Sequence, residues 1–299
     1  MSVPMKYVLE QGPVLAGLGR TAIEAIKQQM GASKPTGVPQ LPGPEITTIL
    51  PPRSKGLIST YVRHVGGDPR AYKNEVPAHL FPQWSFGLAS QALAGLPYPL
   101  VKAVNGGCTI VQHHPLPTGQ PLHVSVRLEN IDDNGRRAIM QTRVITGTAE
   151  IPNAIEASLF ALVPLKQPGG SGKSKRERPR VPQGAKEIDW WRLKPDAGLD
   201  FAKLTGDFNP LHWIPAYAKA SGFRSVILHG FSTMARAWEG LGRQHLARSR
   251  RITAFNVRFT RPLVLPARVG LYTQGDEVIV GDAPGGPAYM TGTFETSPL

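Results

Sequence analysis

The feature that most constrains the fold is a pattern of predicted elements that occurs twice along the chain. In each half, a helix-forming stretch is followed by several strand-like runs. The helix is predicted over 83–96 in the first half and over 227–246 in the second. Two similar units of roughly 110 residues indicate an internal duplication, so each unit is expected to fold around one helix.

The strand-like runs predict an antiparallel sheet in each unit. They cover 57–62, 108–113, 123–131, 138–148 and 155–165 in the first half, and 252–259, 267–274, 277–280 and 288–294 in the second. The segments 111–119 and 257–266 also share a signature, in which a strand runs into a Pro-Leu turn. One long helix against several strands favours the α+β class.

Composition divides the chain into four regions. Residues 1–50 contain a predicted helix between positions 5 and 30 and then an extended connector rich in Pro and Gly. Residues 51–165 form the first unit, 166–186 a basic flexible linker, and 187–299 the second unit. The 29 Pro and 32 Gly of the 299 residues divide the chain into short elements and argue against a long helical bundle.

The formal net charge of +13 suggests an anionic partner. Six positive residues and one negative residue between Lys166 and Pro182 supply +5 of that charge, and charge in a linker often serves solubility alone. No stacking platform or nucleic-acid motif accompanies it, so we expect no nucleic-acid function.

One cysteine, Cys108, permits no intrachain disulfide and no thiolate zinc site, and we expect it to be a small core residue. We find no secretory signal and no uninterrupted apolar span of the ~18 residues that a membrane helix needs. These observations predict a cytoplasmic protein without stable membrane insertion. Whether it forms a homodimer is left open.

The stretch Gly206-Asp207-Phe208-Asn209-Pro210-Leu211-His212 places a carboxylate, an amide and an imidazole within six residues. Gly and Pro form turns, so these polar side chains can converge on one point. A carboxylate and an imidazole aimed at one place can activate a water and deliver a proton. A surface turn with polar residues is the alternative interpretation of the same residues.

The stretch from Phe201 to His212, followed by Ala216 and Ala218, resembles the hydratase-2 signature of the MaoC-like dehydratases. Leu228-His229-Gly230, which begins the next predicted helix, also matches that family. The resemblance is specific over 187–299 and weaker over 57–165, where it includes the segment Pro77–Pro82. It implies a double hot-dog fold, in which two antiparallel sheets each wrap a central helix as a pseudo-dimer.

The resemblance implies reversible hydration of trans-2-enoyl thioesters to (R)-3-hydroxyacyl thioesters, a hydro-lyase reaction without metal or other cofactor. Asp207 and His212 would activate the water, with Asn209 orienting it. His212 is the expected proton shuttle, because the reference pKa of histidine is about 6.5. The substrate would be a thioester of coenzyme A or of acyl carrier protein.

Negative charge develops on the thioester oxygen during this reaction. We predict that the backbone N–H of Gly230, at the start of a helix, forms the oxyanion hole. His229 either contacts substrate or holds the backbone of Gly230 in place. We predict that Arg258 and Arg261 bind phosphates of coenzyme A or an acidic carrier surface, with a solvated basic face as the alternative.

The first unit keeps Gly67-Asp68 at the corresponding place but lacks the Asn-Pro and the His that follow in the second unit. We therefore expect it to be catalytically silent and to bind the acyl chain. Two alternatives to the leading function stay open: a 3-hydroxyacyl carrier-protein dehydratase in fatty acid or polyketide synthesis, and a non-catalytic acyl-thioester binding module. Chain length, carrier, pathway direction and the role of residues 1–50 are not determined by these patterns.

Overall fold

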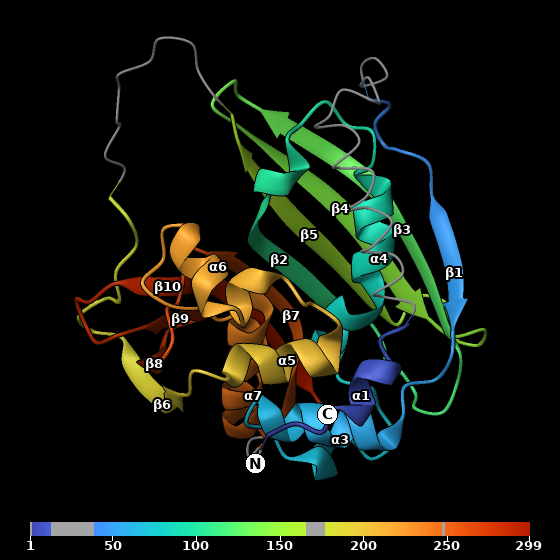
Figure 1. The fold of residues 1–299 in the computed structure, drawn as a ribbon. Coiled ribbons are helices and arrows are strands. Elements are labelled where there is room, and N and C mark those ends of the chain that lie inside the picture. The colour runs from blue at the N-terminus through green and yellow to red at the C-terminus, as the bar shows by residue number, and fades with distance from the viewer. Residues whose placement is uncertain (1, 13–38, 166–176, 247–248) are drawn as a thin grey trace.

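A computed structural model describes residues 2–12, 39–165, 177–246 and 249–299. Its strands form one ten-stranded antiparallel sheet in the order β1-β3-β4-β5-β2-β7-β10-β9-β8-β6 (Figure 1). The strands of the first half are β1 (Ile46–Leu50), β2 (Val104–Gln112), β3 (Leu122–Asp133), β4 (Arg137–Gly147) and β5 (Ile155–Pro164). Those of the second half are β6 (Lys186–Leu193), β7 (Arg250–Phe259), β8 (Ala267–Gln274), β9 (Glu277–Gly281) and β10 (Ala288–Pro298).

The two halves have the same topology. If the strands of each half are numbered one to five, both follow the order 1-3-4-5-2, and they meet through their second strands, β2 and β7. This symmetry confirms the internal duplication and the double hot-dog architecture. The two predicted sheets join edge to edge into one sheet.

One long helix packs on the sheet in each lobe, on the same side of it (Figure 1). In the first lobe this is α4 (Pro82–Ala92), and in the second it is α7 (Gly230–Leu246). Helices α3 (Lys55–His64) and α5 (Ala197–Thr205) pack against each other between the lobes, and α1 (Lys6–Leu9) lies against α5. The short helices are α6 (Pro215–Ala220) and the 3₁₀ turns η1 (Pro69–Tyr72), η2 (Ala78–Leu80), η3 (Leu100–Lys102) and η4 (Pro210–His212).

The strand predicted over 57–62 was wrong, because this stretch belongs to helix α3. The buried residues Leu57, Ile58, Tyr61 and Val62 recur at helical spacing and form one buried face. The Ser54 hydroxyl caps the helix by accepting a hydrogen bond from Leu57 N at 3.1 Å. The first strand, β1, instead lies in the region predicted to be an extended connector, and it pairs with β3.

The other predicted strands are confirmed, with ends that differ by a few residues. Helix α4 ends at Ala92, four residues before its predicted end, and is shorter than α7, with 11 residues against 17. The predicted N-terminal helix lies mostly outside the described residues, as does most of the basic linker. Within the described residues, no helix has both the length and the apolarity required to cross a membrane.

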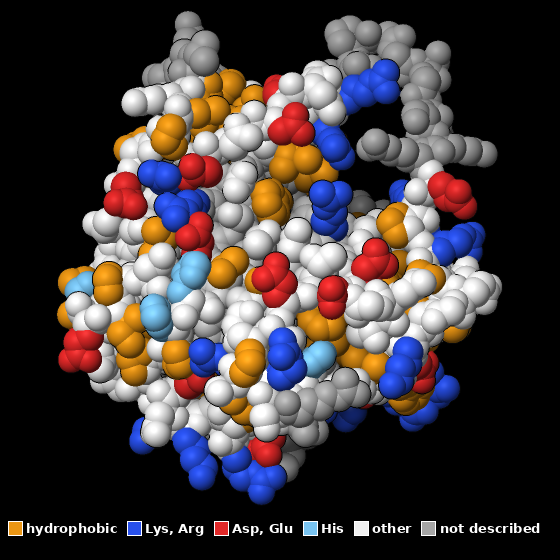
Figure 2. Space-filling model, turned by 180° about the vertical axis from the view of Figure 1, so that it is seen from behind, with side chains coloured by type: hydrophobic (Ala, Val, Ile, Leu, Met, Phe, Trp, Pro, Cys, Tyr) orange, Lys and Arg blue, Asp and Glu red, His pale blue; other side chains and the backbone are white. Residues whose placement is uncertain are grey.

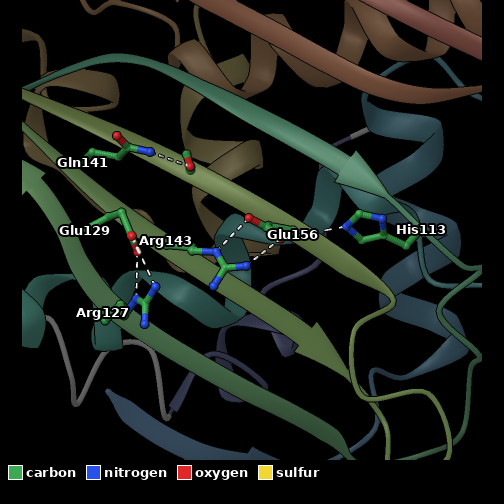
Figure 3. Close-up of polar contacts among 7 residues, drawn as sticks. His113, Arg127, Glu129, Gln141, Arg143 and Glu156 are labelled. Atoms are coloured by element: carbon green, nitrogen blue, oxygen red, sulfur yellow. Dashed lines mark hydrogen bonds and ion pairs between the residues drawn. The ribbon is translucent and has the colours of Figure 1, made fainter. Parts of the chain in front are cut away.

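The sheet face turned away from the helices carries charges of both signs, interspersed over its middle (Figure 2). In the first lobe these side chains pair across neighbouring strands (Figure 3). The Arg143 guanidinium binds Glu156 at 2.7 Å, and His113 lies 3.9 Å from the same carboxylate. Along β3, Arg127 binds Glu129 at 2.7 Å. Half-exposed pairs of this kind contribute little to stability, so the fold depends on the opposite, apolar face.

The core lies between the sheet and the helices. Cys108 is fully buried there, as predicted, beside Met234 of α7. Gly107, the neighbour of Cys108, makes the close approach of β2 to β7 possible. Its φ is +150°, and a Cβ at this position would lie 2.2 Å from the carbonyl oxygen of Val257.

We expect Gly107→Ala to lower the free energy of unfolding by about 2–4 kcal/mol, because the methyl group would push β7 away from β2. Urea unfolding followed by circular dichroism measures the effect. Gly242→Ala on α7 is the matched control, since a Cβ at that position would meet no atom within 4 Å. The control should gain about 0.5–1 kcal/mol, and an equal response of both variants would contradict the prediction.

Candidate active site

The polar turn of the sequence follows directly from helix α5. This helix ends at Gly206, which adopts the left-handed conformation with φ +81° that glycine tolerates best. The Asp207 carboxylate then accepts a hydrogen bond from Asn209 N at 3.3 Å, and the Asn209 side chain accepts one from Leu211 N at 3.1 Å. These local bonds close the turn and present Asp207, whose side chain is 23% exposed, to a cavity.

His212 ends the turn and has a fixed tautomer. Its Nδ1 lies 2.8 Å from the carbonyl oxygen of Ile227. A carbonyl can only accept, so Nδ1 carries the proton in this bond and Nε2 keeps a lone pair. Helix α5 packs tightly against the main chain of His212, because a Cβ at Gly198 would lie 2.1 Å from the His212 carbonyl oxygen. The side chain therefore presents a proton acceptor at a defined place on the cavity wall.

His229 contacts the turn through its main chain and through the ring of His212. Its Nε2 donates to the carbonyl oxygen of Asp207 at 2.9 Å, and its ring stacks on that of His212 with 3.6 Å between centroids. Burial, and then the neighbouring His212, lower the pKa of His229 well below its usual value. The stack thus contains a neutral His229, which binds the main chain of the turn at Asp207.

The cavity at this site has a volume of about 350 Å³ and is lined by Asp207, Asn209, His212 and Gly230. Gly230 begins helix α7, and its amide has no acceptor among the described residues. Phe259 of β7 packs directly on it, since a Cβ at Gly230 would lie 2.6 Å from that ring. The site thus combines a carboxylate, a free imidazole nitrogen and a free amide at a helix N-terminus.

The first lobe completes the cavity wall. Ala103, Val104 and Asn105, at the start of β2, line the cavity together with the residues of the second lobe. A second cavity of about 300 Å³ shares Val104, Asn105 and Asp207 with the first and extends along α4 and β5. The sequence did not predict these first-lobe residues, because they approach the site only through the pairing of β2 with β7.

The two predicted arginines have different positions. Arg261 lines the cavity near Tyr289, whereas Arg258 is exposed on β7 and is not among the described residues that line the cavity. Burial and a hydrogen bond with Asp282 raise the pKa of Tyr289 to about 12, while Arg224 and Arg261 act in the opposite direction. Arg224 was not predicted, and its position next to a turn gave no sequence signal.

Asp207, His212 and His229 could in principle hold a metal ion, because one ligand atom from each lies within 4.8 Å of the others. However, Nε2 of His229 already donates to the Asp207 carbonyl, and Nδ1 of His212 to the Ile227 carbonyl. Nε2 of His212 and the Asp207 carboxylate stay available at the cavity, while the unpartnered Nδ1 of His229 is buried. This arrangement fits activation of a water better than a three-ligand metal site.

The first lobe contains a counterpart of this site. Helix α3, the left-handed Gly66 and turn η1 follow one another as α5, Gly206 and η4 do in the second lobe. In this order Tyr72 takes the place of His212, and His79, just before α4, takes the place of His229. Gly67 takes the place of Asp207, so the expected correspondence of Gly67-Asp68 to Gly206-Asp207 was wrong by one residue. His79 lies in the segment Pro77–Pro82 of the weaker resemblance, but its correspondence to His229 was not predicted.

The counterpart site is filled by the other lobe. Glu239 of α7 inserts its carboxylate against Gly67, where a Cβ would lie 2.3 Å from the carboxyl carbon. Its Oε1 is 3.1 Å from Nε2 of His79, and both side chains are buried. The Tyr61 hydroxyl contacts Nδ1 of His79 at 3.0 Å. Protein side chains occupy this space. Their presence supports the prediction that the first lobe is catalytically silent.

The chain is similar in sequence to known proteins. Residues 177–285 match the family model described as MaoC like domain. The 3-hydroxyacyl-thioester dehydratase X of Mycobacterium tuberculosis is 26% identical over 243 residues, covering 79% of this chain and 82% of that protein. The peroxisomal enoyl-CoA hydratase 2 of Arabidopsis thaliana is 28% identical over 161 residues, covering 48% of this chain and 50% of that protein.

Solved structures show the same fold. The crystal structure of HtdX from Mycobacterium tuberculosis superimposes with a TM-score of 0.67 at 23% identity, covering 86% of this chain and all of that chain. A conserved hypothetical protein from the same organism, described as a double hotdog fold, gives 0.53 at 13% identity, covering 87% of this chain and 96% of that chain. These likenesses confirm the predicted fold. The match of residues 177–285 to the MaoC like domain model confirms the predicted resemblance over that part of the chain.

The buried His229 and the partly buried His64 predict a pH dependence of stability. Burial lowers the pKa of His229, and burial lowers that of His64 to about 3, so both take up protons more readily in the unfolded chain. The unfolded state then binds more protons below pH ~6.5, and the free energy of unfolding should fall by up to about 1.4 kcal/mol per pH unit for each histidine as the pH decreases.

Urea unfolding between pH 7 and 5 measures this slope. His229→Gln should reduce it, whereas His114→Gln, at an exposed position, should leave it unchanged. A slope that is the same in wild type and His229→Gln would contradict the assignment of a neutral His229.

Proposed function

We propose that this chain, whose residues 177–285 form a MaoC-like domain, catalyses the reversible hydration of trans-2-enoyl thioesters to (R)-3-hydroxyacyl thioesters. The observation that supports it most is the convergence of Asp207, His212 and the free Gly230 amide on one cavity. The similar proteins named as a dehydratase and a hydratase support a hydro-lyase in general. The (R) configuration rests on the resemblance to hydratase 2.

In the proposed mechanism, the Asp207 carboxylate and Nε2 of His212 hold one water by two hydrogen bonds. Nε2 takes a proton from this water as its oxygen bonds to C3 of the enoyl group. The π electrons of the C2–C3 bond move onto the thioester carbonyl, forming an enolate. The protonated His212 then returns the proton to C2, so atoms and charge balance and the reverse sequence is dehydration.

The Gly230 amide stabilises the enolate oxygen. Free N–H groups and the dipole at a helix N-terminus favour negative charge, and loss of one such donor costs on the order of 3–4 kcal/mol in other enzymes. The absence of a side chain at Gly230 leaves room for Phe259, which packs on the helix start. Main-chain atoms held in this way need little rearrangement during the reaction.

The second cavity supports the proposal that the first lobe binds the acyl chain. It adjoins the water-binding residues at Asp207 and is lined by apolar groups of α4 and β5, among them Phe86, Leu93 and Leu159. The shorter α4 leaves space where a longer central helix would lie. A medium or long acyl chain would fit this space after its thioester is bound at Gly230.

Arg261 lines the cavity together with Tyr289, and the charge of Arg224 also acts on Tyr289. We propose them, rather than the exposed Arg258, as contacts for the phosphates of coenzyme A or for an acidic carrier protein. Turnover of the same enoyl chain on both carriers distinguishes hydration of coenzyme A thioesters from carrier-protein dehydration in fatty acid or polyketide synthesis. A cytoplasmic location and a homodimer stay predictions.

We expect Asp207→Asn and His212→Gln each to lower kcat by at least ~100-fold, because each removes a group that handles the water or its proton. Hydration of crotonyl-CoA and decenoyl-CoA, followed at the enoyl absorbance, measures this. His113→Gln, on the far face of the sheet, is the control and should keep wild-type activity.

Near-wild-type activity of either site variant would contradict the Asp207/His212 assignment. If the wild type binds the thioesters without turnover, the chain is instead a non-catalytic binding module.

We expect Ala161→Phe to lower kcat/KM for decenoyl-CoA by about tenfold or more and to leave crotonyl-CoA nearly unaffected. Ala161 lines the second cavity, and an added ring would fill the space for carbons beyond the fourth. Ala161→Ser, which adds little volume, is the control. An equal loss for both chain lengths would argue against acyl binding in the first lobe.

A further inference from the structure

The N-terminal segment packs against α5, the helix that leads into the turn of the site. Of residues 2–12, Val3, Tyr7 and Gln11 are buried, with Gln11 fully inaccessible. They lie on the helices between the two lobes, where α1 contacts α5. The Tyr7 hydroxyl is 3.1 Å from the carbonyl oxygen of Gly56 and 2.9 Å from the Thr60 hydroxyl, both on α3. One short segment thus contacts a helix of each lobe.

The buried ion pair of Lys203 and Asp200 on α5 binds the start of this segment. The Lys203 ammonium donates to the Asp200 carboxylate at 3.1 Å and to the Val3 carbonyl oxygen at 3.1 Å. The same Asp200 oxygen accepts from Val3 N at 3.0 Å. A buried ion pair is stable only when its remaining hydrogen-bonding groups are satisfied, and here the N-terminal main chain satisfies them.

Gln11 fastens the end of the segment to the last turn of α5. Its amide nitrogen lies 3.1 Å from the carbonyl oxygen of Leu204 and 3.4 Å from that of Lys203. Helix C-termini leave such carbonyls without partners, so this side chain acts as a C-terminal cap supplied from far away in sequence. The side-chain carbonyl of Gln11 accepts a hydrogen bond from the side-chain amide of Gln83 at 3.1 Å. This bond links Gln11 to α4 of the first lobe.

The capped turn of α5 leads directly into the site. Leu204 is followed by Thr205 and the left-handed Gly206, and the next residue is Asp207. A shift or rotation at the end of α5 would therefore move the Asp207 carboxylate. It would also move the Asp207 carbonyl, which accepts the hydrogen bond from His229.

We propose that Gln11 is a positioning residue for the catalytic turn, acting through the carbonyls of Lys203 and Leu204. This inference rests on the proposed hydratase function and assigns a role to residues 2–11. Gln11 lines neither cavity, so its loss should affect the placement of Asp207 more than the binding of the thioester. Small displacements of reacting groups can lower rates a hundredfold.

Two full-length variants test the proposal. Gln11→Glu replaces the donor by an acceptor that faces the two carbonyls, and Gln11→Met removes the donor without adding charge. We expect kcat for crotonyl-CoA to fall by about tenfold or more in both, with KM changed less than about twofold. Leu9→Ala is the control, since this nearby side chain is 85% exposed, and its kinetics should match the wild type.

A second measurement does not depend on the substrate. The Trp213 indole N–H donates to the carbonyl oxygen of Phe208 at 3.0 Å, so its ¹H–¹⁵N resonance reports on the catalytic turn. We expect this resonance, assigned with Trp213→Phe, to shift in Gln11→Met and not in Leu9→Ala. Circular dichroism shows whether each variant is folded, and Gln11→Met covers the case in which Gln11→Glu does not fold.

The outcomes separate the two proposals. An inactive wild type whose Trp213 resonance still shifts in Gln11→Met would overturn the hydratase function and keep the positioning role. Wild-type kcat and an unshifted resonance in a folded Gln11→Met variant would overturn the positioning role alone. A lower melting temperature with unchanged kcat would also overturn it, because it would reduce Gln11 to a stabilising residue.

Discussion

The pairing of β2 with β7 is the interaction on which the rest of this structure depends. Five residues of β2, from Gly107 to Val111, pair with Arg258 to Ala254 of β7 and join the two five-stranded halves. The pairing satisfies the backbone groups of two strands that would otherwise be sheet edges. It also brings the start of β2 beside the end of β7, so that Val104 and Asn105 of one lobe face the Asp207 of the other. The cavity exists because the lobes are joined there.

The duplicated scaffold is used differently in its two copies. In the second lobe, a side chain follows the left-handed Gly206 and its carboxylate faces a cavity. In the first lobe, Gly67 follows Gly66, and the missing side chain makes room for Glu239 of α7. That carboxylate binds the buried His79, so the counterpart of the site has become a polar contact between lobes. A glycine in place of a side chain thus leaves the space that this lobe contact fills.

Main-chain carbonyls define the chemistry of the two histidines at the site. The Ile227 carbonyl fixes the proton of His212 on Nδ1, and the Asp207 carbonyl fixes that of His229 on Nε2. Burial keeps His229 neutral, which avoids a positive charge stacked on His212. The bond at Nδ1 leaves Nε2 as the nitrogen of His212 for the proposed proton transfer. Gln11 in turn donates a hydrogen bond to the Leu204 carbonyl at the end of α5, the helix that leads into the turn.

The sequence by itself determined the duplication, most strands, the long helices and the polar turn at 206–212, because these depend on local periodicity and turn chemistry. It misassigned 57–62, where apolar residues favour a strand locally but α3 buries them on a helical face. Tertiary structure alone decided that β1 pairs with β3, that Glu239 fills the first lobe, and that Gln11 caps α5. Each of these contacts joins residues far apart in the chain, and no local pattern encodes which distant donor will meet which acceptor.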